Sequence, residues 1–242
     1  MCAIAGAFGL LYPQTDIALC HAAGNSTELE EAMDYRFRID GQENYYEKSG
    51  MAAMTLQYMQ SALHAKQIRK FGIPLLLKSL YLFPENGKHD SMEDIRYKLL
   101  TEKMKLEFPL VFLDLKSGES IETMRFLECA DAIVVVLPQQ PYFWDEFMRK
   151  HPDWYGRENV KFIIGRYMEK SKYSLRYYLR RKEFRNDLLG MIPMDVGYMD
   201  AMSEGRAPEF FLKNQWAEKN EEHYEFIFQA QKTAEKLKKW MG

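Results

Sequence analysis

The stretch FPLVFLDLKSGESIETMRFLECADAIVVVLPQQP (Phe108–Pro141) decides the fold class of this chain. Within it, the apolar run Leu110–Leu113 is followed by a helical pattern over about Ser120–Cys129 and then by the continuous run Ala132–Leu137. Short apolar runs that alternate with helical patterns predict βαβ units and a mainly parallel sheet. The run Ala132–Leu137 is mostly β-branched, which is typical of a strand buried on both faces.

The same alternation continues on both sides of this stretch. Further strands are predicted at Ile17–Cys20, Leu80–Phe83, Val160–Ile164 and Leu188–Ile192. Helices are predicted from Ser26 and over about Gly50–Lys66, Met92–Lys105, Phe143–His151, Ser174–Lys182, Val196–Glu204 and Trp216–Trp240, and a loop over Asp34–Lys48. Because no repeat or linker interrupts the pattern, we expect a single α/β domain over residues 1–242, with helices on both faces of the sheet.

Two apolar segments are expected to serve packing rather than binding. The first, MCAIAGAFGLLY, is small and apolar, like a helix that packs tightly on a sheet. In the second, Met51, Met54 and Met59 recur at helical spacing, and methionine commonly fills irregular gaps in a core.

Composition limits the classes of function. Hydrophobic residues make up 47% and charged residues 28% of the 242 residues, which argues against a disordered chain. A net charge of −2 gives no whole-molecule case for nucleic acid or membrane binding. The three cysteines lie far apart without a CxxC pair, so we expect no zinc site or disulfide and a reducing cytoplasm. No segment approaches the ~20 uninterrupted apolar residues that a membrane span needs.

Three segments narrow this fold class to a family. They are FPLVFLDLKSG (Phe108–Gly118) with its following helix and strand, NVKFIIGRY (Asn159–Tyr167), and GMIPMDVGYMDAMSEGRAPEFFLKN (Gly190–Asn214). The last is in step with the signature IPxDxxxxxAxxxGxP, except that its final proline, Pro208, comes one residue late. In this order the segments resemble the ParA/MinD-like P-loop ATPases, including the TadZ-like pilus-positioning members. The resemblance implies a P-loop NTPase-like fold.

The resemblance also implies where a nucleotide would bind. It assigns Asp114 as the Mg²⁺-associated residue at the end of a Walker B strand, with Ser117 and Gly118 in the next turn. It assigns Pro193 and Asp195 to the loop beside the adenine, so ATP or ADP with Mg²⁺ are the implied cofactors. From the residues alone, an Asp after a buried strand needs a cation or a water network, or it caps the neighbouring turn. A proline after a strand can equally start a helix.

The sequence departs from this family at three points. It contains no KGGxGK[ST]-like loop, which would supply the backbone N–H groups and the lysine that hold phosphates. The stretch Cys20–Asn25 has no carboxylate where the family carries an acidic motif. Arg166, which can only donate hydrogen bonds, stands where the family has an adenine-reading Asn. We therefore expect impaired or absent ATP hydrolysis. A second expectation is an N-terminally truncated copy of an active ATPase, with the first strand and phosphate loop upstream of Met1.

A local basic patch opens a third possibility. Eight cations occur from Arg166 to Arg185, and the candidate binding residues are Lys172, Arg176, Arg180, Arg181 and Arg185. They could bind nucleic-acid backbones without sequence preference, meet an acidic protein or anionic lipid, or form a solvated helix face. Our leading hypothesis is a cytoplasmic ParA/MinD-like positioning, pilus-assembly or chromosome-partitioning partner. Family dimerisation makes a homodimer possible, with the long last helix as one candidate interface.

Overall fold

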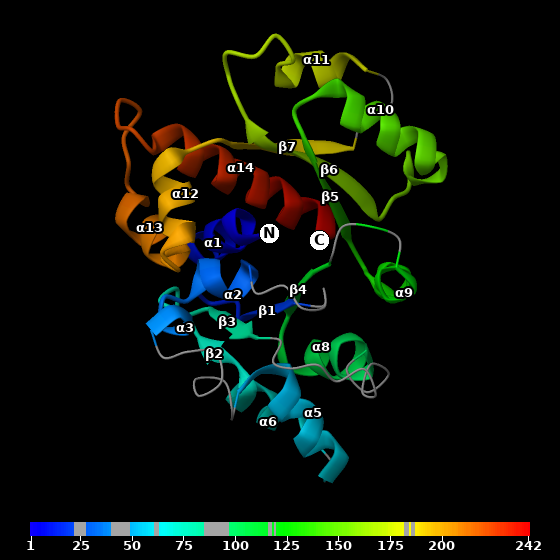
Figure 1. The fold of residues 1–242 in the computed structure, drawn as a ribbon, viewed down its shortest axis with the longest axis vertical. Helices are drawn as coiled ribbons and strands as arrows, with labels where there is room; N and C mark the ends of the chain where they lie inside the picture. Colours follow the sequence, from blue (N-terminus) through cyan, green and yellow to red (C-terminus); the bar gives the residue numbers. More distant parts are fainter. Residues whose placement is uncertain are drawn as a thin grey trace. The chain divides into compact units, whose positions relative to one another are not determined.

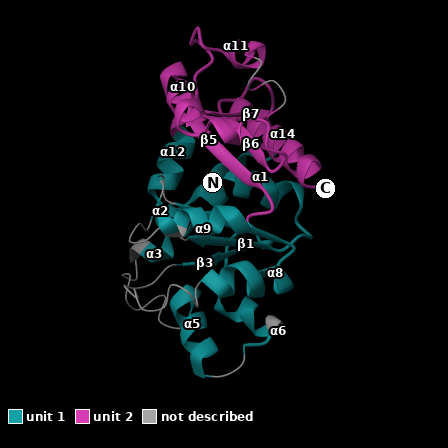
Figure 2. Cartoon of the chain, turned by 90° about the vertical axis from the view of Figure 1, so that its right-hand side faces the viewer, with its two compact units in different colours: residues 1–129, 197–215 teal, residues 130–196, 216–242 magenta. Residues whose placement is uncertain are grey.

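A computed structural model describes residues 1–21, 28–39, 49–60, 63–84, 97–115, 118, 120–181, 184 and 187–242. These residues form two compact units (Figures 1 and 2). Unit 1 contains Met1–Cys129 and Gly197–Gln215, and unit 2 contains Ala130–Val196 and Trp216–Gly242. The helix starts predicted at Ser26 and Met92 lie outside the described residues, as does most of the predicted loop.

The sheet of unit 1 has the strand order β2-β3-β1-β4. The strands β1 (Ile17–His21), β3 (Leu80–Phe83) and β4 (Leu110–Asp114) are parallel, with β1 between the other two. The edge strand β2 (Ile73–Pro74) is antiparallel to β3 and was not predicted, because two residues carry no periodic signal. All of β1 is buried, as a central parallel strand requires.

Helices surround this sheet. The short α3 (Arg36–Ile39) occupies the start of the predicted loop, and the helix predicted to reach Lys66 is divided into α5 (Gly50–Gln60) and α6 (Ala65–Ile68). Met51 and Met54 are fully buried as predicted, whereas Met59 is 55% exposed. The helices are α1 (Cys2–Leu11), α2 (Glu28–Met33), α3 (Arg36–Ile39), α5 (Gly50–Gln60), α6 (Ala65–Ile68), α8 (Met104–Glu107), α9 (Ile121–Cys129), α12 (Val196–Ser203, in unit 1 from Gly197 on) and α13 (Ala207–Asn214).

The apolar helix α1 packs tightly on two neighbours. Its Phe8 ring meets Phe112 of β4 edge-on, with 5.4 Å between the ring centroids. On another side, a Cβ added at Gly6 would lie 2.3 Å from the Phe211 ring of α13. A side chain at position 6 would therefore separate α1 from α13. The expectation that this segment packs on a sheet is confirmed, and the contact with α13 is an addition.

Unit 2 is built on a three-stranded sheet in the order β5-β6-β7, with all strands parallel. The strands are β5 (Ile133–Pro138), β6 (Val160–Tyr167) and β7 (Leu188–Pro193), and the helices are α10 (Pro141–Lys150), α11 (Leu175–Arg180) and α14 (Tyr224–Met241). The indole of Trp144 lies at the centre of an aromatic core and donates to the carbonyl of Pro138 over 2.7 Å. The predicted mainly parallel α/β fold is confirmed.

Two predictions in unit 2 need correction. The last helix begins at Tyr224 rather than Trp216, because residues 216–223 form turns in which Glu221 accepts the backbone N–H of Glu218. The strand β5 was predicted to be buried on both faces. Among the described strands it pairs with β6 alone, and Val136 is 53% exposed.

Candidate functional site

The carboxyl ends of β1 and β4 bring two titratable residues side by side in unit 1. In the parallel ladder, His21 at the end of β1 is in register with Asp114 at the end of β4. His21 is 2% exposed and Asp114 is half-buried. Ligands of parallel α/β sheets bind beyond the carboxyl ends of the strands, so Asp114 occupies the position predicted for it. Ser117 lies outside the described residues, and Gly118 is exposed with φ at +125°.

A buried carboxylate joins this end of the sheet from the next helix. Nδ1 of His21 lies 3.4 Å from Oε2 of Glu30, and Glu30 is only 1% exposed. Sequence analysis missed this residue because its carboxylate comes from α2 rather than from the stretch directly after β1. The site is therefore more acidic than the sequence alone predicted.

The start of α1 belongs to the same region of unit 1. Burial raises the pKa of the Cys2 thiol, the α-amino group of Met1 acts in the opposite direction, and the carboxylates of Asp114 and Glu30 raise it further. The largest of these charge effects is that of the positive α-amino group, and the two carboxylates oppose it.

This environment fits one half of a magnesium–nucleotide site. Asp114 offers the carboxylate oxygen that Mg²⁺ prefers. Within the described ranges, no three His, Cys, Asp or Glu side chains gather into a metal site, so an ion here would need oxygens from a ligand. For the phosphate half, the printed sequence contains no glycine-rich loop with a lysine.

The other two predicted nucleotide-associated residues lie in unit 2. Pro193 ends β7 and is in register with Tyr167 of β6. Two residues on, Oδ2 of Asp195 lies 3.0 Å from Nδ1 of His223, the residue directly before α14. Sequence analysis missed His223 because 28 residues separate the two partners. This contact ties the exit of β7 to the start of α14.

Arg166 adopts an unusual backbone conformation near the end of β6. Its φ of +51° lies in the left-handed region, which residues other than glycine, Asn and Asp adopt rarely. The side chain is exposed. The position where the resemblance expects an adenine-reading Asn therefore presents a cation to solvent.

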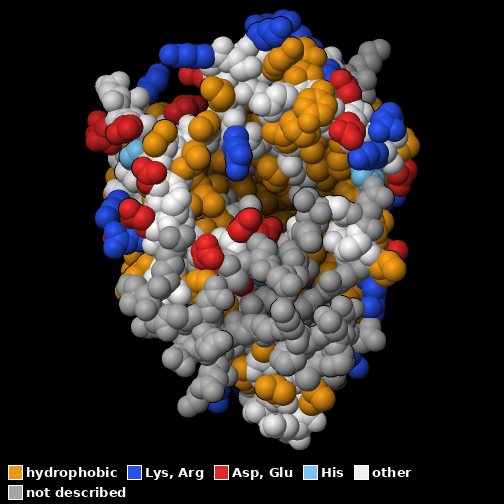
Figure 3. Space-filling model, viewed as in Figure 1, with side chains coloured by type: hydrophobic (Ala, Val, Ile, Leu, Met, Phe, Trp, Pro, Cys, Tyr) orange, Lys and Arg blue, Asp and Glu red, His pale blue; other side chains and the backbone are white. Residues whose placement is uncertain are grey.

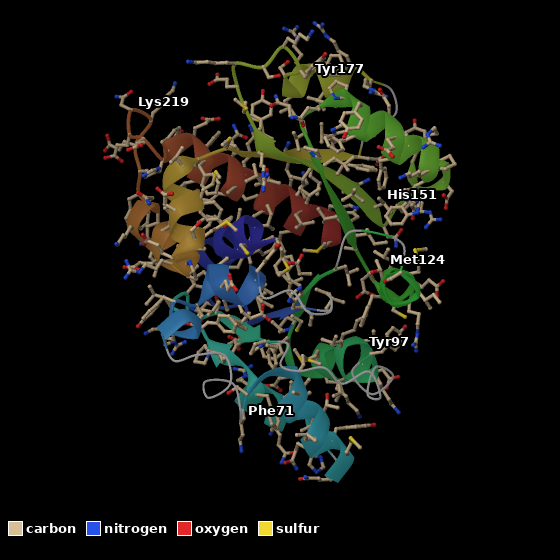
Figure 4. All side chains as sticks on the ribbon, viewed as in Figure 1. Phe71, Tyr97, Met124, His151, Tyr177 and Lys219 are labelled. Atoms are coloured by element: carbon tan, nitrogen blue, oxygen red, sulfur yellow. The ribbon has the colours of Figure 1, made fainter. Side chains whose placement is uncertain are left out.

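Cations gather around α11, where Figure 3 shows Lys and Arg side chains along the top of the view. Lys172, Arg176 and Arg180 are exposed, and Lys172 lies 5.0 Å from the centroid of the Tyr173 ring. Tyr177, labelled in Figure 4, contacts Tyr173 edge-on at 5.4 Å. These three cations with their two tyrosines are named the basic surface from here on.

Two members of the predicted patch do not belong to this surface. Arg181 is half-buried: its Nη1 pairs with Oδ1 of Asp145 at 2.8 Å, and its guanidinium lies 5.1 Å from the Phe184 ring centroid. Arg181 is thus engaged within unit 2. Arg185 lies outside the described residues.

A buried amide holds the segment that leads into the basic surface. Nε2 of Gln139 donates to the carbonyls of Met168 and Tyr173 over 3.1 and 2.8 Å. Its Oε1 accepts the N–H of Met168 over 2.9 Å, and the hydroxyl of Tyr178 donates to its backbone carbonyl. The side chain of Gln139 therefore fixes both ends of residues 168–173.

Parallel sheets flanked by helices, with a carboxylate at the carboxyl end of one strand, are typical of α/β folds that bind ligands at that end of the sheet. Comparison with solved structures identifies it as the P-loop NTPase fold of the MinD and ParA ATPases. A ParA family ATPase from Chlorobium tepidum TLS has a TM-score of 0.68 at 11% identity, over 96% of this chain and 92% of that chain.

Two further structures give the same result. For the MinC:MinD cell division protein complex of Aquifex aeolicus the TM-score is 0.64 at 16% identity, over 98% of this chain and 88% of that chain. For the septum site-determining protein MinD of Pyrococcus horikoshii OT3, complexed with Mg-ADP, it is 0.64 at 13% identity, over 100% and 90%. No protein-family model matches the sequence, and a search of curated proteins finds no match. At these identities the likeness establishes the fold.

None of the helices among the described residues combines the length and apolar character needed to cross a bilayer.

Proposed function

We propose that this chain is a ParA/MinD-like homologue with impaired or absent nucleotide hydrolysis that acts as a positioning, assembly or partitioning partner. The observation that carries the proposal is an ATPase fold whose 242-residue sequence has no glycine-lysine phosphate loop. Two features support it. The stretch Cys20–Asn25 has no carboxylate where the family carries an acidic motif, and Arg166 stands where an adenine-reading Asn is expected.

Thermal unfolding with nucleotide tests the proposal. A ligand at about 100 times its Kd adds about 2.7 kcal/mol to the free energy of unfolding, a rise of several degrees in Tm for a chain of this length. We expect no rise with millimolar Mg-ATP or Mg-ADP and no release of phosphate. Mg²⁺ alone is the control for ion binding at Asp114.

A positive shift has a defined follow-up. The variant Asp114→Ala removes the carboxylate at the end of β4, and Asp131→Ala removes an exposed carboxylate as a matched control. A nucleotide-dependent shift that Asp114→Ala abolishes and Asp131→Ala preserves would contradict the proposal. It would indicate a functional magnesium–nucleotide site.

The basic surface supports a second candidate, non-specific nucleic-acid binding. Lys172, Arg176 and Arg180 are exposed together, and phosphate contacts by such cations release counterions. Affinity for a random-sequence DNA duplex should then fall steeply with salt. An affinity that does not change with ionic strength, or no binding at 50 mM salt, would exclude non-specific nucleic-acid binding.

A further inference from the structure

The basic surface contains an aromatic ring that its neighbours hold in place and that solvent still reaches. The ring of Tyr177 contacts Tyr173 at 5.4 Å and the buried Tyr178 at 5.1 Å between centroids, with interplanar angles of 68° and 83°. Both contacts are closer to perpendicular than to parallel, so neither neighbour stacks flat on Tyr177. This residue is 37% exposed. A ring that is braced on two sides binds a flat ligand at a small cost in side-chain entropy.

Another exposed ring of unit 2 is already stacked. Phe228 of α14 is 39% exposed. The ring of Tyr224 lies parallel to it, at 5.6 Å and 11°, and the ammonium group of Lys232 lies 5.4 Å from its centroid. The helix itself therefore supplies the stacking partner of Phe228, which distinguishes this ring from Tyr177.

The charges around the tyrosines of the basic surface are nearly all positive. Arg176 and Arg180 are exposed one helical turn apart on α11, and Lys172 is exposed just before this helix. Within residues 166–181 the only carboxylate is that of Glu169. A surface of this charge attracts a polyanion, because each phosphate contact releases counterions.

The rings decide which kind of polyanion fits this surface. A double helix presents phosphates and sugars and keeps the faces of its bases stacked inside, so an exposed tyrosine ring gains little from it. Helix α11 has six residues, fewer than two turns, and is too short to act as a long recognition helix in a major groove. An anionic lipid surface offers phosphates but no ring to stack on Tyr177. A single strand offers both phosphates and open base faces.

We propose that the basic surface binds single-stranded nucleic acid, with one base stacked on Tyr177 and the neighbouring phosphates at the three cations. This inference deepens the second candidate function and rests on it, because that function needs phosphate contacts alone and the inference adds a base. The whole surface belongs to unit 2. The chain passes between the units at residues 129–130, 196–197 and 215–216, and none of these crossings falls between β6 and β7.

Affinities for matched probes test the stacked base. Fluorescence anisotropy at about 50 mM salt compares an oligothymidylate of about 12 nucleotides, an abasic strand with the same number of phosphates, and a duplex of the same length. We expect the oligothymidylate to bind at least about fivefold more tightly than the abasic strand, which is the lower limit for one stacked base. Oligouridylate and oligodeoxyuridylate differ only in the 2′-hydroxyl group and distinguish RNA from DNA as the ligand.

Variants of the protein separate the ring from the charges. Tyr177→Ala should weaken oligothymidylate binding at least about fivefold, leave abasic-strand binding and the salt dependence unchanged, and Tyr177→Phe should restore the affinity. Arg176→Ala should instead lower the slope of log affinity against log salt concentration by roughly 0.7 for both strands. The matched control is Tyr155→Ala, which removes a 44% exposed tyrosine before β6 and should change neither quantity. If Tyr177→Ala does not fold, the comparison of oligothymidylate with the abasic strand decides.

Lysine acetylation locates the bound strand. Lys172 should react with an amine-specific reagent in the free protein and should become protected when oligothymidylate is bound. Lys213 of α13, whose side chain is 70% exposed, is the reference and should react equally in both samples.

The possible outcomes distinguish this inference from the function on which it rests. Equal affinity for oligothymidylate and the abasic strand, or tighter binding of the duplex, would overturn the inference and leave non-specific phosphate binding in place. No binding of any probe would exclude both. A Lys172 that does not react in the free protein would show that the surface is covered. Protection of Lys172 by anionic lipid vesicles but by no oligonucleotide would assign the surface to a membrane.

Discussion

The carboxylate of Asp195 lies 3.0 Å from the imidazole Nδ1 of His223, with the Asp195 side chain 9% exposed and the His223 side chain 23% exposed. This contact joins the loop after β7 to the residue preceding α14. It is an attachment within unit 2 that does not involve the sheet. The packing of Gly190 under Thr233 is a second attachment of the same helix.

Replacing His223 by Ala should therefore destabilise the start of α14. A hydrogen bond to a charged, largely buried carboxylate contributes about 1.5–3 kcal/mol, and a loss in this range is expected in urea unfolding. Arg206→Ala is the control, because Arg206 faces Glu204 at 3.5 Å on the surface and its removal should cost at most about 0.5 kcal/mol. Equal losses in the two variants would contradict a stabilising role for the Asp195–His223 contact.

Gly6→Ala should destabilise unit 1 although alanine favours helices. The added Cβ would lie 2.3 Å from a ring atom of Phe211, and this ring is fully buried. Overpacking of this kind costs about 1–3 kcal/mol, more than the ~1 kcal/mol that alanine gains over glycine in a helix. In a Phe211→Ala background the same substitution should become neutral or stabilising. Denaturant unfolding of the four variants gives the coupling energy, and additive effects would contradict the contact.

The stability of the protein should fall between pH 10 and 12 in a manner that depends on Tyr178. Burial raises the pKa of Tyr178 to about 12, and the nearby Tyr177 adds to the effect. The unfolded state loses this proton near pH 10 while the folded state keeps it, so the free energy of unfolding decreases with pH until about 12. Two pKa units correspond to at most about 2.7 kcal/mol.

The variant Tyr178→Phe distinguishes the effect of Tyr178 titration on stability from the effects of the other tyrosines. The variant lacks the hydrogen bond to the Gln139 carbonyl, so it should be about 1 kcal/mol less stable at pH 8. The difference should shrink to zero or reverse by pH 12. A constant difference from pH 8 to pH 12 would show that Tyr178 does not titrate with folding.

Arg181 and Arg176 should respond differently to alanine substitution. Arg181 pairs with Asp145 and covers Phe184, so Arg181→Ala should lower the free energy of unfolding by about 1 kcal/mol. Arg176→Ala should leave stability within about 0.5 kcal/mol. If the basic surface binds DNA, Arg176→Ala should reduce the slope of log affinity against log salt concentration by about one, whereas Arg181→Ala should leave this slope unchanged. A lower slope for Arg181→Ala would instead place Arg181 at the DNA.

The sequence predicted every strand of the two sheets except β2, because each of these strands is a short apolar run bounded by polar residues. Leu110–Leu113 and Val160–Ile164 became β4 and β6 with extensions of one to three residues. The missed elements were short, such as β2, or lacked a clear apolar period, such as α13. The pairing of β5 with β6 alone among the described strands could not be predicted, because the run IVVVL records what a strand buries and not whether a neighbour is present.

The sequence could predict only those site residues whose position follows from the neighbouring sequence. Asp114 follows its strand directly, so its place at the carboxyl end of β4 could be read from the sequence. Glu30 and His223 meet their partners only through the fold, and no motif links them. Arg181 and Arg176 look equivalent in the sequence, and only the position of Asp145 distinguishes them.

Gln139 has a consequence for any ligand of the basic surface. Because its amide anchors both ends of residues 168–173, the short segment carrying Lys170 and Lys172 is already ordered before an anion arrives. Ordering a flexible loop on association would consume roughly 1 kcal/mol per residue. An anionic ligand that binds Lys170 and Lys172 therefore does not have to order this segment first, and its binding free energy is not reduced by that entropy cost.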